Sequence, residues 1–177
     1  PLGRRNMKRA ILILVMMICG VTFWSGGSMC RAEEKTMKES PKQQCERLMD
    51  AVLPFAEEML KKHGEFFPFG GVLNLEGKVI NQGAWTGEEH PPSVDVIKVL
   101  HEAFKKGAKD REFLATALVY DVKVVPPGKS EKTDAVAVDI DHRDGVSQTV
   151  IYPYSLKDGK LNLGETYTIP MQHPVFR

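Results

Sequence analysis

The densest group of side chains that could do chemistry is the segment Asp139-Ile140-Asp141-His142-Arg143-Asp144-Gly145. Asp139 and Asp141 are two residues apart, so on a strand they share one face, where paired carboxylates can share a proton or hold a divalent ion. Together with His142 they are the residues that a hydrolase or a metal-dependent enzyme would use. An EF-hand loop is excluded, because counting from Asp139 places Asp144 at position six and Val150 at position twelve. The simpler interpretation is a solvated strand face that leads into an Asp-Gly hairpin turn.

A second group of candidates is aromatic and points to ligand binding. Trp85 and His90 occur in a polar loop predicted over residues 81–92, and functional residues often lie on loops held by a rigid scaffold. Tyr152 and Tyr154 occur on a predicted strand. The aromatic residues that could line an apolar groove are Phe66, Phe67, Phe69, Trp85, Tyr152 and Tyr154. The simpler alternative is that these aromatic rings form the core and its rim.

No other motif names a reaction. The five histidines never occur at a metal-ligand spacing such as His-x-x-x-His, so the sequence predicts no metal site and no cofactor. A Gly-x-Ser-x-Gly elbow, a Ser-x-x-Lys pair and a phosphate-binding loop are also missing from the sequence. Cys45 falls on the apolar face of a predicted helix, where a thiol is usually a small buried hydrophobic group. The lack of a catalytic motif favours a binding domain, although an enzyme stays open.

Charge is distributed unevenly along the chain. The formal net charge is +1, but residues 1–32 hold five of the 24 basic residues and no acid. The remaining 19 basic and 23 acidic residues give the rest of the chain a net charge of −4. An acidic domain lacks the basic stripe that neutralises phosphates, so we expect no nucleic acid among its partners.

The first 32 residues have the layout of a secretory signal peptide. Basic residues are followed by an uncharged run over residues 10–30 and then by small residues suited to cleavage near Ala32. We therefore expect an exported protein, periplasmic or secreted, with residues 1–6 lying upstream of a natural start at Met7. An uncleaved membrane anchor and a lipoprotein are the alternatives, and in either case only this leader contacts the membrane.

The rest of the chain is predicted to be a flexible linker over residues 33–39 and one domain over residues 40–177. Ser40 opens a capping box, and the helix behind it should end near Gly64. The apolar residues of that helix, spaced by three and four, are Cys45, Leu48, Met49, Val52, Phe55, Ala56, Met59 and Leu60.

The remaining patterns predict two strands, a second helix and a meander of strands. Ser93 is predicted to cap the second helix, which ends at Gly107. The residues expected on its inner face are Val94, Ile97, Leu100, His101 and Phe104. Period-two alternation from Leu114 to Pro126 predicts a long strand, and later strands are joined by Asp-Gly turns. The predicted fold is α+β in the order α-β-β-α-β-β-β, with an antiparallel sheet of about five to six strands and two helices packed on one face.

Three segments carry a resemblance to a known group of proteins. They are Glu65-Phe66-Phe67-Pro68-Phe69-Gly70-Gly71, the strand from Asp134 that ends in His142-Arg143-Asp144-Gly145, and Tyr152-Pro153-Tyr154. On these segments, roughly residues 45–176 resemble a family of small exported bacterial α+β proteins of uncharacterised function. The resemblance implies a bacterial source and a single compact domain. It implies no catalytic residue.

Three functions therefore remain as hypotheses. The first is an exported, non-catalytic domain that binds a protein or a small ligand through its sheet face or the Trp85 to His90 loop. The second is a hydrolase or metal-dependent enzyme that uses Asp139, Asp141 and His142. The third is an immunity-type protein that neutralises a toxin, which fits the size and the acidic domain by analogy.

Overall fold

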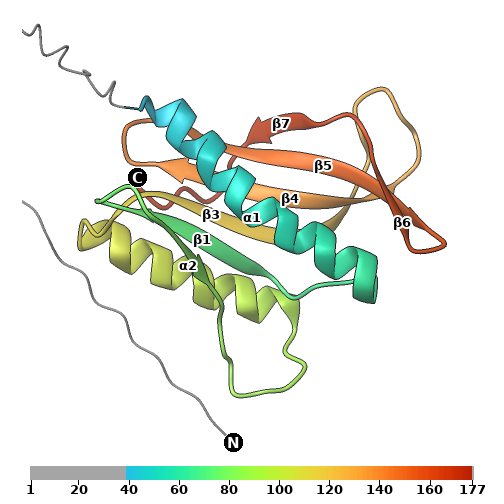
Figure 1. Cartoon of the computed structure of the whole chain (residues 1–177), viewed down its shortest axis with the longest axis horizontal. Coiled ribbons are helices and arrows are strands. Elements are labelled where there is room, and N and C mark those ends of the chain that lie inside the picture. The colour runs from blue at the N-terminus through green and yellow to red at the C-terminus, as the bar shows by residue number, and fades with distance from the viewer. Residues whose placement is uncertain (1–38, 177) are drawn as a thin grey trace, which may run out of the picture. The chain divides into compact units, whose positions relative to one another are not determined.

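The structure is a computed structural model that describes residues 39–176. The predicted leader and residues 33–38 of the predicted linker lie outside the described residues. Two helices are present in the described part of the chain, α1 (Pro41–His63) and α2 (Ser93–Lys109) (Figure 1). The strands are β1 (Phe69–Asn74), β2 (Val79–Gln82), β3 (Phe113–Val124), β4 (Thr133–His142), β5 (Ser147–Lys157), β6 (Lys160–Leu163) and β7 (Tyr167–Pro170).

All seven strands form one open antiparallel sheet in the order β2-β1-β3-β4-β5-β6. β7 also pairs with β5, along residues 148–151, whereas β6 pairs with residues 154–157 of the same strand. The α+β class is confirmed, but the predicted count of five to six strands is too low. The last predicted strand divides in two at Gly164, whose backbone N–H donates to the Pro153 carbonyl at 2.7 Å, directly after the last pair of β5 with β6.

The two helices cover opposite faces of the sheet, so the prediction that both pack on one face is wrong. Leu73 of β1 packs against the buried side of α1, whereas its neighbour Val72 packs against α2. Successive side chains of a strand point to opposite faces, so each face of β1 meets a different helix. The first five residues of β1 are buried, which is typical of a strand that is covered on both sides. Figure 1 shows α1 crossing in front of the strands.

α1 begins and ends where the sequence predicts. The Ser40 side chain accepts a hydrogen bond from the Gln43 amide, and the Gln43 side chain accepts one from the Ser40 amide at 2.9 Å. Gly64 ends the helix in a left-handed conformation with φ of 78°. Pro54 lies inside the helix without ending it.

The α1 side of the sheet holds the larger part of the core. The buried side chains of α1 are Cys45, Leu48, Val52, Ala56 and Leu60. They pack on Val136, Val138 and Ile140 of β4 and on the neighbouring strands. Full burial stabilises by about 1.5–3 kcal/mol for each side chain of leucine size, so this face dominates the stability of the fold. None of the helices within residues 39–176 has the length and hydropathy needed to span a bilayer.

Candidate functional site

The acidic pair and His142 are directed to opposite faces of the sheet. Asp139 and Asp141 alternate with Ile140, which lies in the core under α1, so both carboxylates face the α2 side. His142 is 2% exposed and binds Gln44 of α1, with 2.8 Å between Nε2 and the side-chain oxygen. The structure therefore does not bring the three candidate catalytic residues together.

Asp141 anchors the C-terminal segment. Its side chain is 1% exposed, and one carboxylate oxygen accepts the backbone N–H groups of Val175 at 2.6 Å and Phe176 at 3.1 Å. A buried carboxylate that accepts two amides has a structural role, because it satisfies backbone donors that burial would otherwise leave unpaired. The Asp141 carboxylate therefore stabilises the fold and is not exposed to bind a substrate or a metal ion.

Asp139 lies in a hydrogen-bonded polar cluster on the same face. Its oxygens accept from Thr149 Oγ1 at 2.5 Å and from the Tyr120 hydroxyl at 3.4 Å. Burial raises the pKa of Asp139, and the two hydrogen bonds together with the nearby His101 and His173 lower it by less. His101 is held by the His173 carbonyl, 2.9 Å from its Nε2 atom.

His142 is a satisfied core residue. Its Nδ1 atom accepts the Asp144 backbone N–H at 3.0 Å, so Nε2 carries the proton that reaches Gln44. Burial lowers the pKa of His142, which favours this neutral form.

Cys45 is equally unsuited to chemistry, because burial raises the pKa of its thiol to about 12. Across residues 39–176, no group of three His, Cys, Asp or Glu side chains is placed to hold a metal ion.

The two candidate tyrosines of β5, Tyr152 and Tyr154, lie on the α1 face and pack in or against the core. Tyr154 is 7% exposed, and its hydroxyl donates to Asp121 at 3.0 Å. The Tyr152 hydroxyl lies 3.9 Å from the Met49 sulfur of α1. Burial raises the pKa of both phenols, so both remain protonated at neutral pH. Neither tyrosine joins Trp85 or His90.

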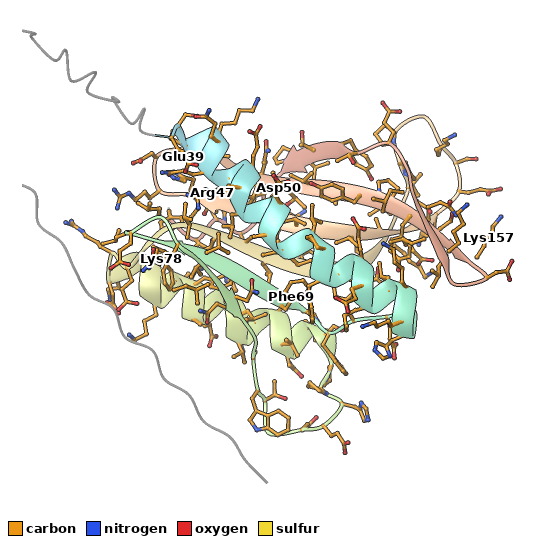
Figure 2. All side chains as sticks on the ribbon, in the orientation of Figure 1. Glu39, Arg47, Asp50, Phe69, Lys78 and Lys157 are labelled. Atoms are coloured by element: carbon orange, nitrogen blue, oxygen red, sulfur yellow. The ribbon has the colours of Figure 1, made fainter. Side chains whose placement is uncertain are left out.

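An apolar hollow lies instead beside the C-terminal half of α1, and we call it the aromatic groove. Its aromatic and thioether side chains are Phe55, Met59, Phe66, Phe67 and Phe69, and its other wall includes residues 81–84. The cavity has a volume of about 670 Å³. Figure 2 shows the side chains of this region, with Phe69 labelled beside α1.

The chain builds this groove by a short return from α1 to β1. After the turn at Gly64, the rigid segment around Pro68 carries Phe66 inward and leaves Phe67 half exposed. Phe69 contacts Phe55 edge to face, with ring centres 4.8 Å apart, and Phe66 at 5.9 Å. These contacts fix the rings, so the groove is preformed.

The loop between β2 and α2 closes one side of the groove. The His90 ring lies over Phe67, with 6.3 Å between the ring centres. Trp85 is 76% exposed and lines a separate hollow of about 490 Å³ with Pro91 and Lys98. Of the two loop candidates, His90 therefore borders the groove and Trp85 does not line it.

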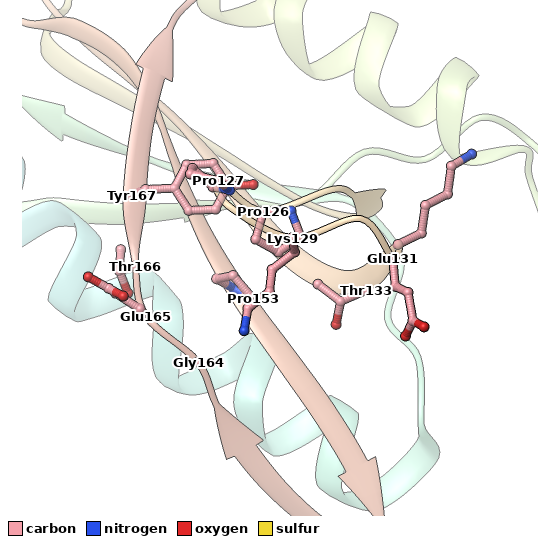
Figure 3. A pocket seen from close by; sticks show the side chains of 11 residues that line it. Pro126, Pro127, Lys129, Glu131, Thr133, Pro153, Gly164, Glu165, Thr166 and Tyr167 are labelled. Atoms are coloured by element: carbon pink, nitrogen blue, oxygen red, sulfur yellow. The ribbon is translucent and has the colours of Figure 1, made fainter.

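A further cavity of about 520 Å³ lies between the β3–β4 loop and the break at Gly164. Figure 3 shows Pro127, Lys129, Pro153 and Tyr167 around it. Its charged side chains, Lys129, Glu131, Lys132 and Glu165, are all exposed and come from two connecting segments. Its lining lacks the continuous aromatic wall of the aromatic groove. It is therefore the weaker candidate for ligand binding.

Comparison with known proteins adds no relative. No protein-family model, no curated protein and no solved structure matches the chain.

The sequence had indicated Phe66, Phe67 and Phe69 as groove candidates, and the structure places all three in the groove. It missed Phe55 and Met59, which it assigned to the core face of α1. The width of that apolar face could have indicated them. The face has eight apolar residues, and α1 buries only five, so some of the eight remain outside the core.

Proposed function

We propose that this protein is an exported bacterial binding domain that holds an apolar group of a protein or small ligand in the aromatic groove, without catalysing a reaction. The observation that carries the proposal is the joint exposure of Phe55, at 47%, and Phe67, at 50%, in one preformed hollow. Contiguous exposed apolar surface marks interaction sites on soluble proteins. The groove volume also falls within the usual range of ligand pockets, about 300–1,000 Å³. Export rests on the basic and apolar leader.

The other two hypotheses have less support. A hydrolase or metal-dependent enzyme needs Asp139, Asp141 and His142 at one place, and these side chains lie on opposite faces of the sheet. An immunity-type protein is a special case of the binding domain in which the partner is a toxin. It draws on the size and acidity of the chain, and no particular contact favours it.

The test is the binding of a neutral apolar dye, N-phenyl-1-naphthylamine, to the full chain, followed by fluorescence. Phe67→Ala should weaken saturable binding, because a bound ligand covers the exposed half of the ring. Covering about 100 Å² of apolar surface corresponds to about 2 kcal/mol, so we expect the Kd to rise about 30-fold.

Leu75→Ala is the matched control. Leu75 is 57% exposed in the turn between β1 and β2 and does not line the groove. Its Kd should stay within about twofold of the parent protein, as expected for a surface site without ligand contact. Equal effects of the two variants, or no saturable binding by the parent protein, would remove the support for the proposal.

A further inference from the structure

We infer that the ligand of the aromatic groove is an extended peptide segment, which adds as a strand to the free edge of β2 and carries apolar side chains flanked by basic ones. This inference rests on the proposed function and specifies its ligand class. It joins two features that meet at one place, an unpaired sheet edge and the groove beside it. Strand addition to an exposed edge is a general mode of peptide recognition.

The backbone of β2 presents hydrogen-bonding groups outward. β2 is the terminal strand of the sheet and pairs only with β1 among the described strands. The Asn74 amide donates to the Lys78 carbonyl at 3.0 Å, which sets the alternation of this antiparallel pair. Ile80 therefore pairs with β1, whereas the N–H and C=O groups of Val79 and Asn81 point away from the sheet.

The same segment forms a wall of the aromatic groove. Residues 81–84 line it together with Phe67 and Phe55. A strand added to β2 lies about 4.8 Å from it, and its alternate side chains point to the same face. The backbone of such a peptide would bind Val79 and Asn81 while every second side chain enters the groove.

The β2 edge also lacks the protection that the opposite edge carries. Residues 79–87 contain no charge and no proline, and the charge of Lys78, which directly precedes β2, is paired with Glu76 at 3.0 Å. At the far edge, β6 is flanked by Lys157 and Lys160, and β7 ends in Pro170. Lysine and proline at edge strands prevent pairing with other chains. Only one edge of the sheet is thus chemically suited to accept a strand.

The charges around the groove select a basic partner. Glu65 lines the groove, and Glu88 and Glu89 directly precede His90, which lies over Phe67. These three glutamates form no ion pair with any residue from 39 to 176. The two lysines at the end of α1 are already paired with glutamates one turn earlier. A peptide with lysine or arginine beside its apolar side chains complements this rim.

The experiment titrates the full chain with the peptide acetyl-Lys-Thr-Phe-Thr-Phe-Thr-Lys-amide and follows amide hydrogen exchange by NMR. Exchange at Val79 and Asn81 should slow at least about 10-fold, because these amides gain a partner. Exchange at Ile80 and Gln82 should change little, since these amides already face β1. This alternation distinguishes strand addition from binding in the groove alone.

Variants and control peptides complete the test. Val79→Pro removes one outward donor from a residue that does not line the groove and should weaken peptide binding about 10-fold, whereas Leu163→Pro, on the exposed opposite edge, should change it less than about twofold. N-phenyl-1-naphthylamine should bind Val79→Pro as it binds the parent, because Val79 does not line the groove. A peptide N-methylated at alternate amides and one with glutamate in place of lysine should both bind more weakly.

The outcomes separate this inference from the proposed function. Peptide binding without protection of Val79 and Asn81, or with equal affinity for Val79→Pro, overturns strand addition and leaves the binding groove standing. Equal binding of the glutamate peptide overturns the preference for a basic partner. Failure of both the peptide and the dye to bind the parent protein removes the proposed function and this inference together.

Discussion

Replacing Gly71 by alanine tests how the helices are distributed over the sheet. A Cβ atom at Gly71 would lie 2.7 Å from Val52 Cγ1 and 3.3 Å from Leu48 Cδ1, both on α1. At Gly70 it would instead lie 2.6 Å from Phe104 Cζ of α2. The lack of a side chain at Gly71 therefore allows α1 to pack closely on one face of β1, and the lack of one at Gly70 allows α2 to pack closely on the other face.

The size of the effect follows from these distances. Carbon atoms in contact prefer about 3.5–4.0 Å, so the new methyl group overlaps Val52 by roughly 1 Å. Overpacking a rigid core costs about 1–3 kcal/mol, and alanine regains up to about 1 kcal/mol by restricting the unfolded chain. We expect Gly71→Ala to lower the free energy of unfolding by about 1–2 kcal/mol.

A double-mutant cycle measured by urea unfolding assigns that cost to one helix. Val52→Ala makes room for the methyl group, so the cost of Gly71→Ala in that background should fall by at least about 1 kcal/mol. Phe104→Leu lies on the other face and should leave the cost within about 0.3 kcal/mol of its original value. Coupling to Phe104 in place of Val52 would refute the assignment of the helices to opposite faces.

Two further predictions concern the α2 face. Asp141→Ala should destabilise the protein by about 2 kcal/mol and speed amide exchange at Val175 and Phe176, because two buried donors lose their acceptor; unchanged exchange there would contradict the anchoring role. Burial raises the pKa of Asp139, so the folded state keeps a proton that the unfolded state loses above its ordinary carboxyl pKa, and stability falls as pH rises through that window. The gain in urea midpoint from Asp139→Asn should therefore be larger at pH 7 than at pH 4, and an equal gain at both would contradict this linkage.

Local features of the fold could be predicted from the sequence because they depend on neighbouring residues. The cap at Ser40 and the stop at Gly64 each involve atoms within a few residues, and both are confirmed. For α2 the predicted inner face is confirmed at Leu100 and Phe104, which are buried, but it is wrong at its first residue, since Val94 is 69% exposed and Val96 is buried in its place. The helix begins one residue earlier than a Ser93 cap implies, because Pro92 takes the cap position.

The coverage of both sheet faces was harder to predict, because it depends on how distant segments meet. The continuous apolar run from Phe69 to Leu73 was the available signal, since a strand with one solvated face alternates. The separation of His142 from Asp139 and Asp141 follows from the same period of two. The three residues are neighbours in the sequence, which suggested one site. On a strand, however, His142 points to the α1 face and the two aspartates point to the α2 face.

The groove was partly predictable for a similar reason. The aromatic residues around Pro68 were recognised as candidates, but whether the rings face solvent depends on where α1 ends over the sheet. Phe55 and Met59 fit the helical spacing of a core face, but Phe55 is 47% exposed and both side chains line the groove. The unpaired edge of β2 has no signature of its own until the strand order is known.

An NMR structure of the full chain with N-phenyl-1-naphthylamine, based on contacts between the dye and protein protons, shows directly where an apolar ligand binds. We expect contacts to Phe55 and Phe67 in the aromatic groove. Contacts centred on Tyr167 and Pro127 in the other cavity, or an absence of any localised contact, would contradict this expectation.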